Sequence, residues 1–116
     1  MKMDIADVGP RLVKIVLTGR LDTPGVDSIE TRFLATLIPN ANNAVIDMSH
    51  VDFISSMGIR MLVSAARSLK MKRAALAVYG VQDRVAQVFE AAALHKMIPI
   101  CSTEAEALAA VTASSD

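Results

Sequence analysis

Apolar residues along the first forty positions are spaced as in two strands and then as in a helix. A weak strand over 2–8 and a β-rich strand over 11–18 are separated by a Gly-Pro turn, which favours a hairpin. Apolar residues at intervals of three and four follow Thr23 and Pro24, a pair typical of an N-cap before a proline in the first helical position. The helix is expected to end at Pro39.

The rest of the chain predicts strands and helices in alternation. Short apolar runs predict buried strands over 44–48, 75–79 and 97–101. Helical spacing predicts helices through Ile59, Leu62, Ala66 and Leu69, through Val85, Val88, Phe89 and Ala92, and, after a capping box at 103–106, through Ala105, Leu108 and Ala109. Because parallel strands need crossover connections, we expect an α/β fold: a small mixed sheet, with an N-terminal hairpin plus parallel strands and about four helices, in a single domain over 1–116.

Charge and aromatic content restrict the classes of partner. The chain has 116 residues with 12 basic and 12 acidic side chains, so its formal net charge is zero. Attachment to nucleic acid or to an anionic membrane through bulk charge is therefore not expected. With three Phe, one Tyr and no Trp, the chain also lacks the aromatic side chains of a base-stacking platform.

The sequence favours a cytoplasmic protein. Cys101 is the single cysteine, so no disulfide framework can form within the chain. Asp4 and Asp7 interrupt the N-terminus before the apolar stretch of a signal peptide develops. The longest uncharged run, 33–46, contains a proline and three asparagines and does not fit a bilayer-spanning helix.

Functional signal is concentrated between Val45 and Arg60. The pattern predicts a buried strand, a loop, and then Ser55 and Ser56 at the start of a helix. The first amides of a helix have no partner within it, and the macrodipole adds about half a positive charge there. A serine hydroxyl at this place caps the helix, and a phosphate on it would be favoured electrostatically. Gly58 keeps the first turn uncrowded and would admit the close approach of a partner's active site.

Three segments together resemble the signatures of a known family. They are Leu17-Thr18-Gly19-Arg20-Leu21-Asp22, then the run Ile46–Ile54, and then Ser55-Ser56-Met57-Gly58-Ile59. With the order of strands and helices, they resemble the second strand, the central strand and the phosphorylation motif of the STAS domain, typified by bacterial anti-sigma-factor antagonists. The resemblance covers essentially the whole chain.

The resemblance implies a protein switch rather than an enzyme. In such antagonists the serine two positions before the glycine, here Ser56, is phosphorylated by a partner that is both anti-sigma factor and serine kinase. The unphosphorylated form binds the anti-sigma factor and frees the sigma factor, the phosphorylated form lets go, and a serine phosphatase resets it. The resemblance also places Asp22 beside the acceptor serine.

One departure from the family pattern concerns the residue before the acceptor. Many antagonists have an aspartate there, whereas this chain has Ser55. Two adjacent serines leave three readings open: phosphorylation at Ser56, phosphorylation at Ser55, or a domain in which both serines merely cap the helix.

The expected contact surface surrounds these serines. Met57 and Met61 lie one turn apart, off the main apolar stripe, where methionine serves either as an adaptable contact or as core filler. The expected partner-binding residues are Asp22, Ser55, Ser56, Met57, Gly58, Arg60 and Met61. Five basic residues and no acidic ones occur over 53–82, which indicates either a solvated helix face or a positive patch beside the serine: Arg60, Arg67, Lys70, Lys72 and Arg73.

Two other functions stay open at this point. A STAS domain that is never phosphorylated would serve as a fixed subunit of a lipid-transport or stress-sensing complex. An enzyme, such as a small nucleotide hydrolase, is disfavoured because the sequence has no Gly-rich phosphate loop, nucleophile–base pair or complete metal set. Asp47, His50 and Asp52 alone do not make up a metal site, and no cofactor is expected. The sequence does not identify the kinase, the sigma factor or the oligomeric state.

Overall fold

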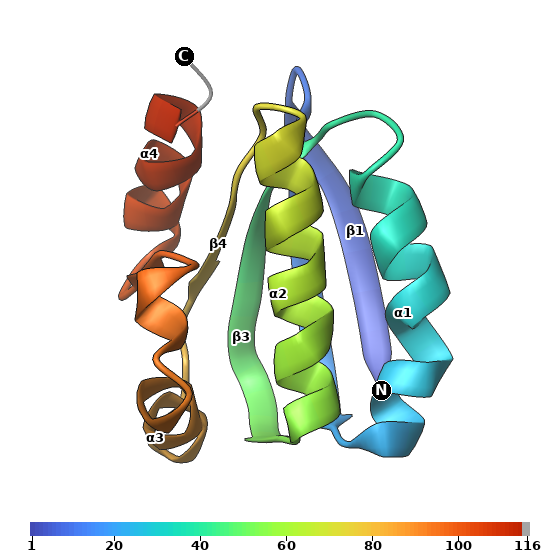
Figure 1. Cartoon of the computed structure of the whole chain (residues 1–116), viewed down its shortest axis with the longest axis vertical. Coiled ribbons are helices and arrows are strands. Elements are labelled where there is room, and N and C mark those ends of the chain that lie inside the picture. Colours follow the sequence, from blue (N-terminus) through green and yellow to red (C-terminus); the bar gives the residue numbers. More distant parts are fainter. Residues whose placement is uncertain (115–116) are drawn as a thin grey trace.

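A five-stranded mixed sheet forms the centre of the molecule (Figure 1). The computed structural model describes residues 1–114, and the strands are β1 (Lys2–Gly9), β2 (Leu12–Leu21), β3 (Asn43–Ile54), β4 (Leu76–Tyr79) and β5 (Ile100–Cys101). They lie in the sheet in chain order, with β1 antiparallel to β2 and all other neighbours parallel. The predicted mixed sheet with an N-terminal hairpin is confirmed.

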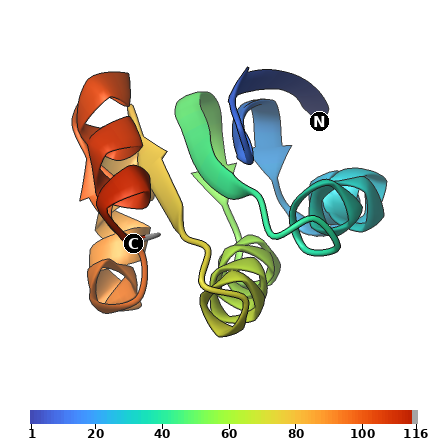
Figure 2. The same ribbon diagram turned by 90° about the horizontal axis from the view of Figure 1, so that it is seen from above.

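Four α-helices in the described residues cover the two faces of the sheet unequally. They are α1 (Thr23–Leu37), α2 (Ser56–Met71), α3 (Asp83–Ala91) and α4 (Glu104–Ser114), and a 3-10 turn at Leu94–Lys96 precedes β5. Figure 2 shows α1, α2 and α3 on one face and α4 on the other. The expectation of about four helices is confirmed.

The main core lies between the sheet and α1, α2 and α3. Buried side chains alternate along β2 and recur at intervals of three and four along α1, the periods of a strand and a helix. Its fully buried residues include Ile15, Leu17, Phe33, Ile46 and Leu62. Burial of each large apolar side chain contributes about 1.5–3 kcal/mol, so this layer fixes how α1 and α2 sit on the sheet.

A smaller core on the opposite face holds α4. Ala107 and Val111 are buried against β3 and β4. The helix predicted through Ala105, Leu108 and Ala109 is confirmed, although Ala105 and Ala109 are exposed and its buried face is formed by other residues. Alanines occur on every side of this helix, and their spacing therefore does not mark the buried face.

β3 is longer than the sequence pattern predicted. The expected strand over 44–48 continues to Ile54, and the expected loop does not form. Beyond Met48 the buried residues are spaced by three, at Val51 and Ile54, instead of by two. The pairing with β2 contains two bulges, each of which accommodates one extra residue of β3. These bulges hide the alternation by which a strand is predicted.

A polar contact ties the start of α4 to the sheet. Lys14 Nζ donates to Glu104 Oε1 at 2.7 Å, and the Tyr79 hydroxyl donates to the same oxygen at 3.2 Å. The hydrogen bond from Lys14 lowers the pKa of Glu104. Burial, together with nearby carboxylates, raises the pKa of Tyr79 to about 12, so this hydroxyl keeps its proton and stays a donor.

The attachment of α4 is expected to weaken in acid. Because the pKa of Glu104 is lowered in the folded chain, its contribution to stability is present above the ordinary pKa of glutamate and is lost as pH falls through the lowered value. Glu104→Gln should remove this dependence. Urea unfolding of both proteins between about pH 6 and about pH 3 measures it. A difference in the free energy of unfolding that stays constant over that range would contradict the expectation.

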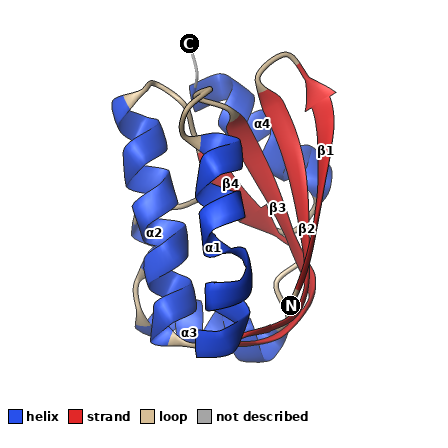
Figure 3. Ribbon diagram, turned by 90° about the vertical axis from the view of Figure 1, so that its right-hand side faces the viewer, coloured by secondary structure: helices blue, strands red, loops and turns tan. Residues whose placement is uncertain are grey.

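No helix of residues 1–114 lies over the outer face of β1 and β2 (Figure 3). The exposed side chains there are mixed in character, among them Lys2, Asp4, Ala6 and Thr18. None of the described helices has the length and apolar character needed to cross a membrane. The residues singled out by the sequence lie instead where β2 and β3 end.

Candidate functional site

β2 and β3 end side by side, and a helix begins directly after each strand. Leu21 pairs with Ile54 in the ladder. Asp22 is the N-cap of α1 and Ser55 is the N-cap of α2. Because parallel strands end at the same edge of a sheet, the first turns of α1 and α2 lie at one end of the molecule (Figure 1). Two helix N-termini therefore direct their positive dipole ends to the same edge.

The hydroxyl of Ser55 is engaged in holding α2 to β2. It donates to the carbonyl oxygen of Leu21 at 2.9 Å and accepts from the amide of Gly58 at 3.3 Å. The Ser55 amide donates to the same Leu21 carbonyl, also at 2.9 Å. Ser55 is thus a structural cap whose hydroxyl proton is already committed.

The neighbouring Ser56 presents its hydroxyl to solvent. It is the first residue of α2, and its side chain is exposed. No hydrogen bond joins that hydroxyl to any part of the chain between residues 1 and 114. The geometry therefore distinguishes two serines that the sequence left equivalent, one holding the helix and one accessible.

The two serines should respond differently to the same substitution. Ser55→Ala is expected to lower the free energy of unfolding by about 1–2 kcal/mol, because it removes the cap of α2 and the bond to Leu21. Ser56→Ala should change it by less than about 0.5 kcal/mol. Urea unfolding followed by circular dichroism measures both values. Equal losses would contradict the assigned roles.

Asp22, rather than the expected Thr23, caps α1. Its Oδ1 accepts from the Gly25 amide at 2.9 Å, and its Oδ2 lies 3.5 Å from Arg20 Nε. The bond from Gly25, with a smaller contribution from Arg20, lowers the pKa of Asp22. The prediction failed by one residue because aspartate and threonine both cap helices, and the carboxylate adds a favourable interaction with the helix dipole. Its negative charge stays at the edge of the sheet where α1 and α2 both begin.

Two glycines let the helix starts approach the strand ends. A Cβ at Gly58 would lie 2.7 Å from Ile54 Cγ1 and 3.1 Å from the carbonyl oxygen of Leu21. A Cβ at Gly25 would overlap the carbonyl oxygen of Arg20. Gly58 is buried, so its expected role as a partner contact is wrong. The missing side chain makes room for the strand beneath the helix.

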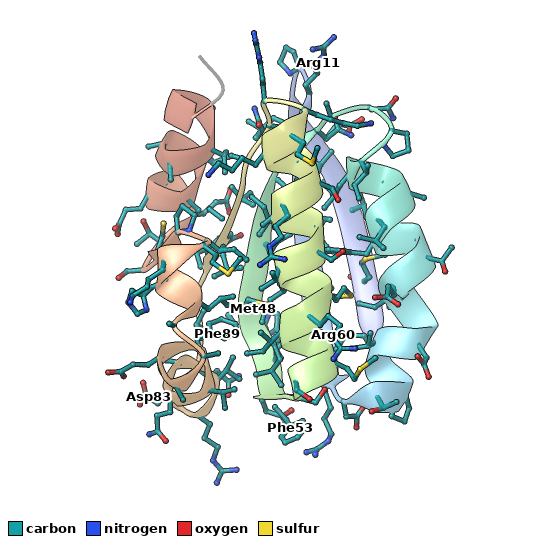
Figure 4. The ribbon with its side chains drawn as sticks, viewed as in Figure 1. Arg11, Met48, Phe53, Arg60, Asp83 and Phe89 are labelled. Carbon is teal, nitrogen blue, oxygen red and sulfur yellow. The ribbon has the colours of Figure 1, made fainter. Side chains whose placement is uncertain are left out.

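Met61 belongs to the core, and the prediction that it contacts a partner is wrong. Its side chain is fully buried, because α2 is rotated so that Met61 lies on the sheet side and Ile59 at the border. Met57 is half-buried against the core, and Arg60 is exposed on the first half of α2 (Figure 4). The buried face of α2 is Gly58, Met61, Leu62, Ala65 and Leu69.

An exposed aromatic residue beside the site was missed by the sequence analysis. Phe53 is 38% exposed, and Arg20 Cζ lies 4.3 Å from the centre of its ring. Figure 4 shows Phe53 at the end of the molecule where α2 begins. Because a loop is expected there, the pattern assigns no direction to Phe53, which in the structure lies on the exposed side of β3 near its end. Aromatic and arginine side chains are enriched at protein interfaces, so this pair extends the candidate surface.

Most of the basic run lies away from Ser56. α2 has 16 residues, so its two ends are about 24 Å apart. Arg60 lies near its start, whereas Arg67 lies in its last third, Lys70 in its last turn, and Lys72 and Arg73 directly after it. The interpretation as a positive patch beside the serine is therefore wrong for Arg67, Lys70, Lys72 and Arg73.

The acidic and histidine side chains near the site do not form a metal centre. Asp47 Oδ1 accepts from the amide and hydroxyl of Ser49 at 2.9 and 2.6 Å, so this carboxylate is engaged at the first bulge of β3. Within residues 1–114, no group of three or more His, Cys, Asp or Glu side chains is placed to hold a metal ion. The chemistry available here is that of an exposed hydroxyl, two helix dipoles and a carboxylate.

Sequence comparison finds one family and several related proteins. Residues 5–107 match the model of the STAS domain. The chain is 24% identical over 94 residues to an anti-sigma-B factor antagonist of Listeria monocytogenes, covering 81% of this chain and 82% of that protein. It is also 24% identical over 110 residues to BtrV of Bordetella bronchiseptica, a candidate anti-sigma factor antagonist, covering 95% and 94%.

Structure comparison finds the same fold in the anti-sigma factor antagonist SpoIIAA. Its unphosphorylated form superposes with a TM-score of 0.78 at 21% identity, covering 92% of this chain and 93% of that one. Its phosphorylated form gives 0.70 at 21% identity, covering 93% and 97%. At this level of identity the likeness establishes the fold alone.

Proposed function

The chain belongs to the STAS domain family, and from this premise we propose that it is an anti-sigma-factor antagonist switched by phosphorylation of Ser56. In this role the unphosphorylated chain binds an anti-sigma factor and releases the sigma factor. Phosphorylation by a partner serine kinase ends the complex, and a serine phosphatase restores it. The chain supplies a docking surface and an acceptor hydroxyl, while the phosphoryl chemistry belongs to its partners. The names of its relatives support this role.

The exposed hydroxyl of Ser56 is the observation that carries the proposal. A kinase must reach the oxygen that it modifies, and the Ser56 hydroxyl is exposed without a competing hydrogen bond from the described chain. The Ser55 hydroxyl is instead bonded to Leu21 and Gly58. A phosphate on Ser56 would lie at the amide end of α2, where the dipole favours an anion. Modification therefore leaves the helix intact.

The switch would act at the docking surface rather than by refolding. That surface consists of the predicted partner-binding residues that are exposed or half-buried, other than the capping Ser55, together with the cation–π pair of Arg20 and Phe53. Its members are Arg20, Asp22, Phe53, Ser56, Met57 and Arg60. Phosphate adds nearly two negative charges in its middle, beside the carboxylate of Asp22. A partner surface that fits a neutral hydroxyl would then meet unpaired, desolvated charge.

A phosphate map tests the proposal. The natural chain, Ser56→Ala and Ser64→Ala are incubated with ATP and an extract of the cells that produce the protein, and each is then mapped by mass spectrometry. Ser64 is an exposed serine two turns along α2, so it controls for unspecific phosphorylation. Phosphate is expected on Ser56 in the natural chain and in Ser64→Ala. In Ser56→Ala, neither Ser55 nor Ser64 should carry phosphate. Phosphate on Ser55 would overturn the choice of residue, and an unmodified natural chain would favour a STAS subunit without a switch.

A further inference from the structure

Three clefts that share lining residues run from the β1–β2 turn, at the end of the molecule opposite Ser56, along the second half of α2. The first, of about 410 Å³, lies between the β1–β2 turn, the residues before β3 and the end of α2, and includes Arg73. The second, of about 270 Å³, shares Arg73 and continues past Lys70 to Met97. The third, of about 230 Å³, shares Lys70 and Met97. We call these three clefts together the cationic trough.

Positive charge is concentrated along this trough. No acidic residue lines any of the three clefts, whereas six cations do: Arg11, Arg67, Lys70, Lys72, Arg73 and Lys96. Figure 4 shows Arg11 at one end of the molecule and Asp83 and Phe53 at the other. The zero net charge of the chain therefore hides a local concentration of positive charge, and an anionic partner would be attracted to the trough.

Two arginines of the trough lie in turns whose backbone conformation suits glycine better. Arg11 and Arg73 have φ of 52° and 62°, in the left-handed region. Glycine adopts this conformation freely, whereas other residues pay about 1–2 kcal/mol. Both arginines thus occupy turn positions where glycine would be less strained. Lys72 already donates to the Ile38 carbonyl at 2.9 Å, so it is not counted among the free cations.

The lining of the trough distinguishes between anionic partners. Its uncharged wall is mostly apolar, with Met97 42% exposed and Asn43 as its one uncharged polar residue, and Met71 beside the end of α2 is 88% exposed. No aromatic residue lines the three clefts, so the trough lacks the aromatic platform on which single-stranded nucleic acid stacks its bases. Exposed methionine with arginine suits a polypeptide that carries aliphatic as well as acidic side chains.

We propose that the cationic trough binds an extended acidic segment of a partner protein, with its carboxylates on Arg11, Arg73 and Lys70 and an aliphatic side chain against Met97. The part of the trough nearest to Ser56 is formed by Ala66, ten residues or about 15 Å along α2. The segment therefore binds irrespective of the state of that serine.

A double variant that carries both Arg11→Gly and Arg73→Gly tests the proposal. Glycine relieves the left-handed strain, so the variant should melt no lower than the natural chain while it loses two charges. Arg11→Gln combined with Arg73→Gln removes the same charges without changing the backbone preference. Arg84→Ala, which removes an exposed cation from the first turn of α3, is the matched control.

The probe is a fluorescein-labelled peptide built of glutamate pairs and leucines, followed by fluorescence anisotropy at low salt. Both double variants should bind it about tenfold more weakly, and Arg84→Ala and Ser56→Glu less than about twofold. A peptide with glutamine in place of glutamate should not bind. Undiminished binding by the double variants would overturn the proposal, as would equal or tighter binding of a single-stranded oligonucleotide of the same charge.

Discussion

Replacing Ser56 with glutamate is expected to weaken binding of the anti-sigma factor by roughly a hundredfold. The new carboxylate would stand in the middle of the docking surface, beside Asp22, whose lowered pKa keeps it ionised. A partner that fits a neutral hydroxyl would have to bury this charge without a counter-ion, at a cost of about 3 kcal/mol. Titration calorimetry of the two purified proteins measures the change in Kd.

Two matched variants separate charge from shape in that experiment. Ser56→Gln has nearly the same size without the charge, and Ser64→Glu places the charge two turns along α2. Each should weaken binding by less than about fivefold. Ser56→Glu should also melt no lower than the natural chain, because an acidic residue at a helix start interacts favourably with the dipole. A loss with Ser56→Gln as large as with Ser56→Glu would contradict the electrostatic switch.

Gly25→Ala is expected to lower the free energy of unfolding by about 2–3 kcal/mol. Its methyl group would overlap the carbonyl oxygen of Arg20 and come within 3.1 Å of Asp22 Oδ1. The obstructing atom belongs to the backbone of β2, so relief requires the start of α1 to move away and the cap at Asp22 to loosen. Alanine elsewhere in a helix would gain up to about 1 kcal/mol over glycine, which makes a net loss diagnostic.

Thr23→Ala is the control for Gly25→Ala. Thr23 is exposed and lies in the same first turn of α1, so its replacement should change the free energy of unfolding by less than about 0.5 kcal/mol. The urea midpoint should fall in Gly25→Ala at an unchanged slope, since the surface exposed on unfolding stays the same. If the two variants unfold at the same urea concentration, α1 does not pack against Arg20 as described.

The order of strands and helices could be predicted because each element carries its own period. The alternation of Val13, Ile15 and Leu17 marks β2, and Val26, Ile29 and Phe33 mark α1 by intervals of three and four. These patterns record which face of an element is buried, and that is a local property. The predicted fold class therefore agrees with the structure.

The rotation of α2 and the roles of the two serines could not be predicted, because they depend on contacts between distant segments. The carbonyl that binds Ser55 belongs to Leu21, 34 positions earlier in the chain. That bond and the absent side chain of Gly58 set how α2 sits on β2, which in turn buries Met61. A helical period alone does not include these constraints.

The formal net charge of zero is a sum over the whole chain, and it does not show where on the surface the charged side chains lie. The basic residues after Arg60 follow the serines closely along the sequence, yet α2 carries them toward the other end of the molecule. A count of opposite charges along the chain is therefore compatible with two surfaces of different character. These two surfaces become visible only once the direction of α2 is known, because α2 has Ser56 at its start and Lys70 in its last turn.

The bulges of β3 also determine where this fold tolerates insertions and deletions. Asp52 is the extra residue between Val51, which pairs with Gly19, and Phe53, which pairs with Arg20. Without Asp52 the strand would alternate regularly, with Phe53 still outward and Ile54 inward. Homologous chains one residue shorter in this segment are therefore best aligned with a gap at Asp52, which leaves the serines and the glycine of the next helix in register.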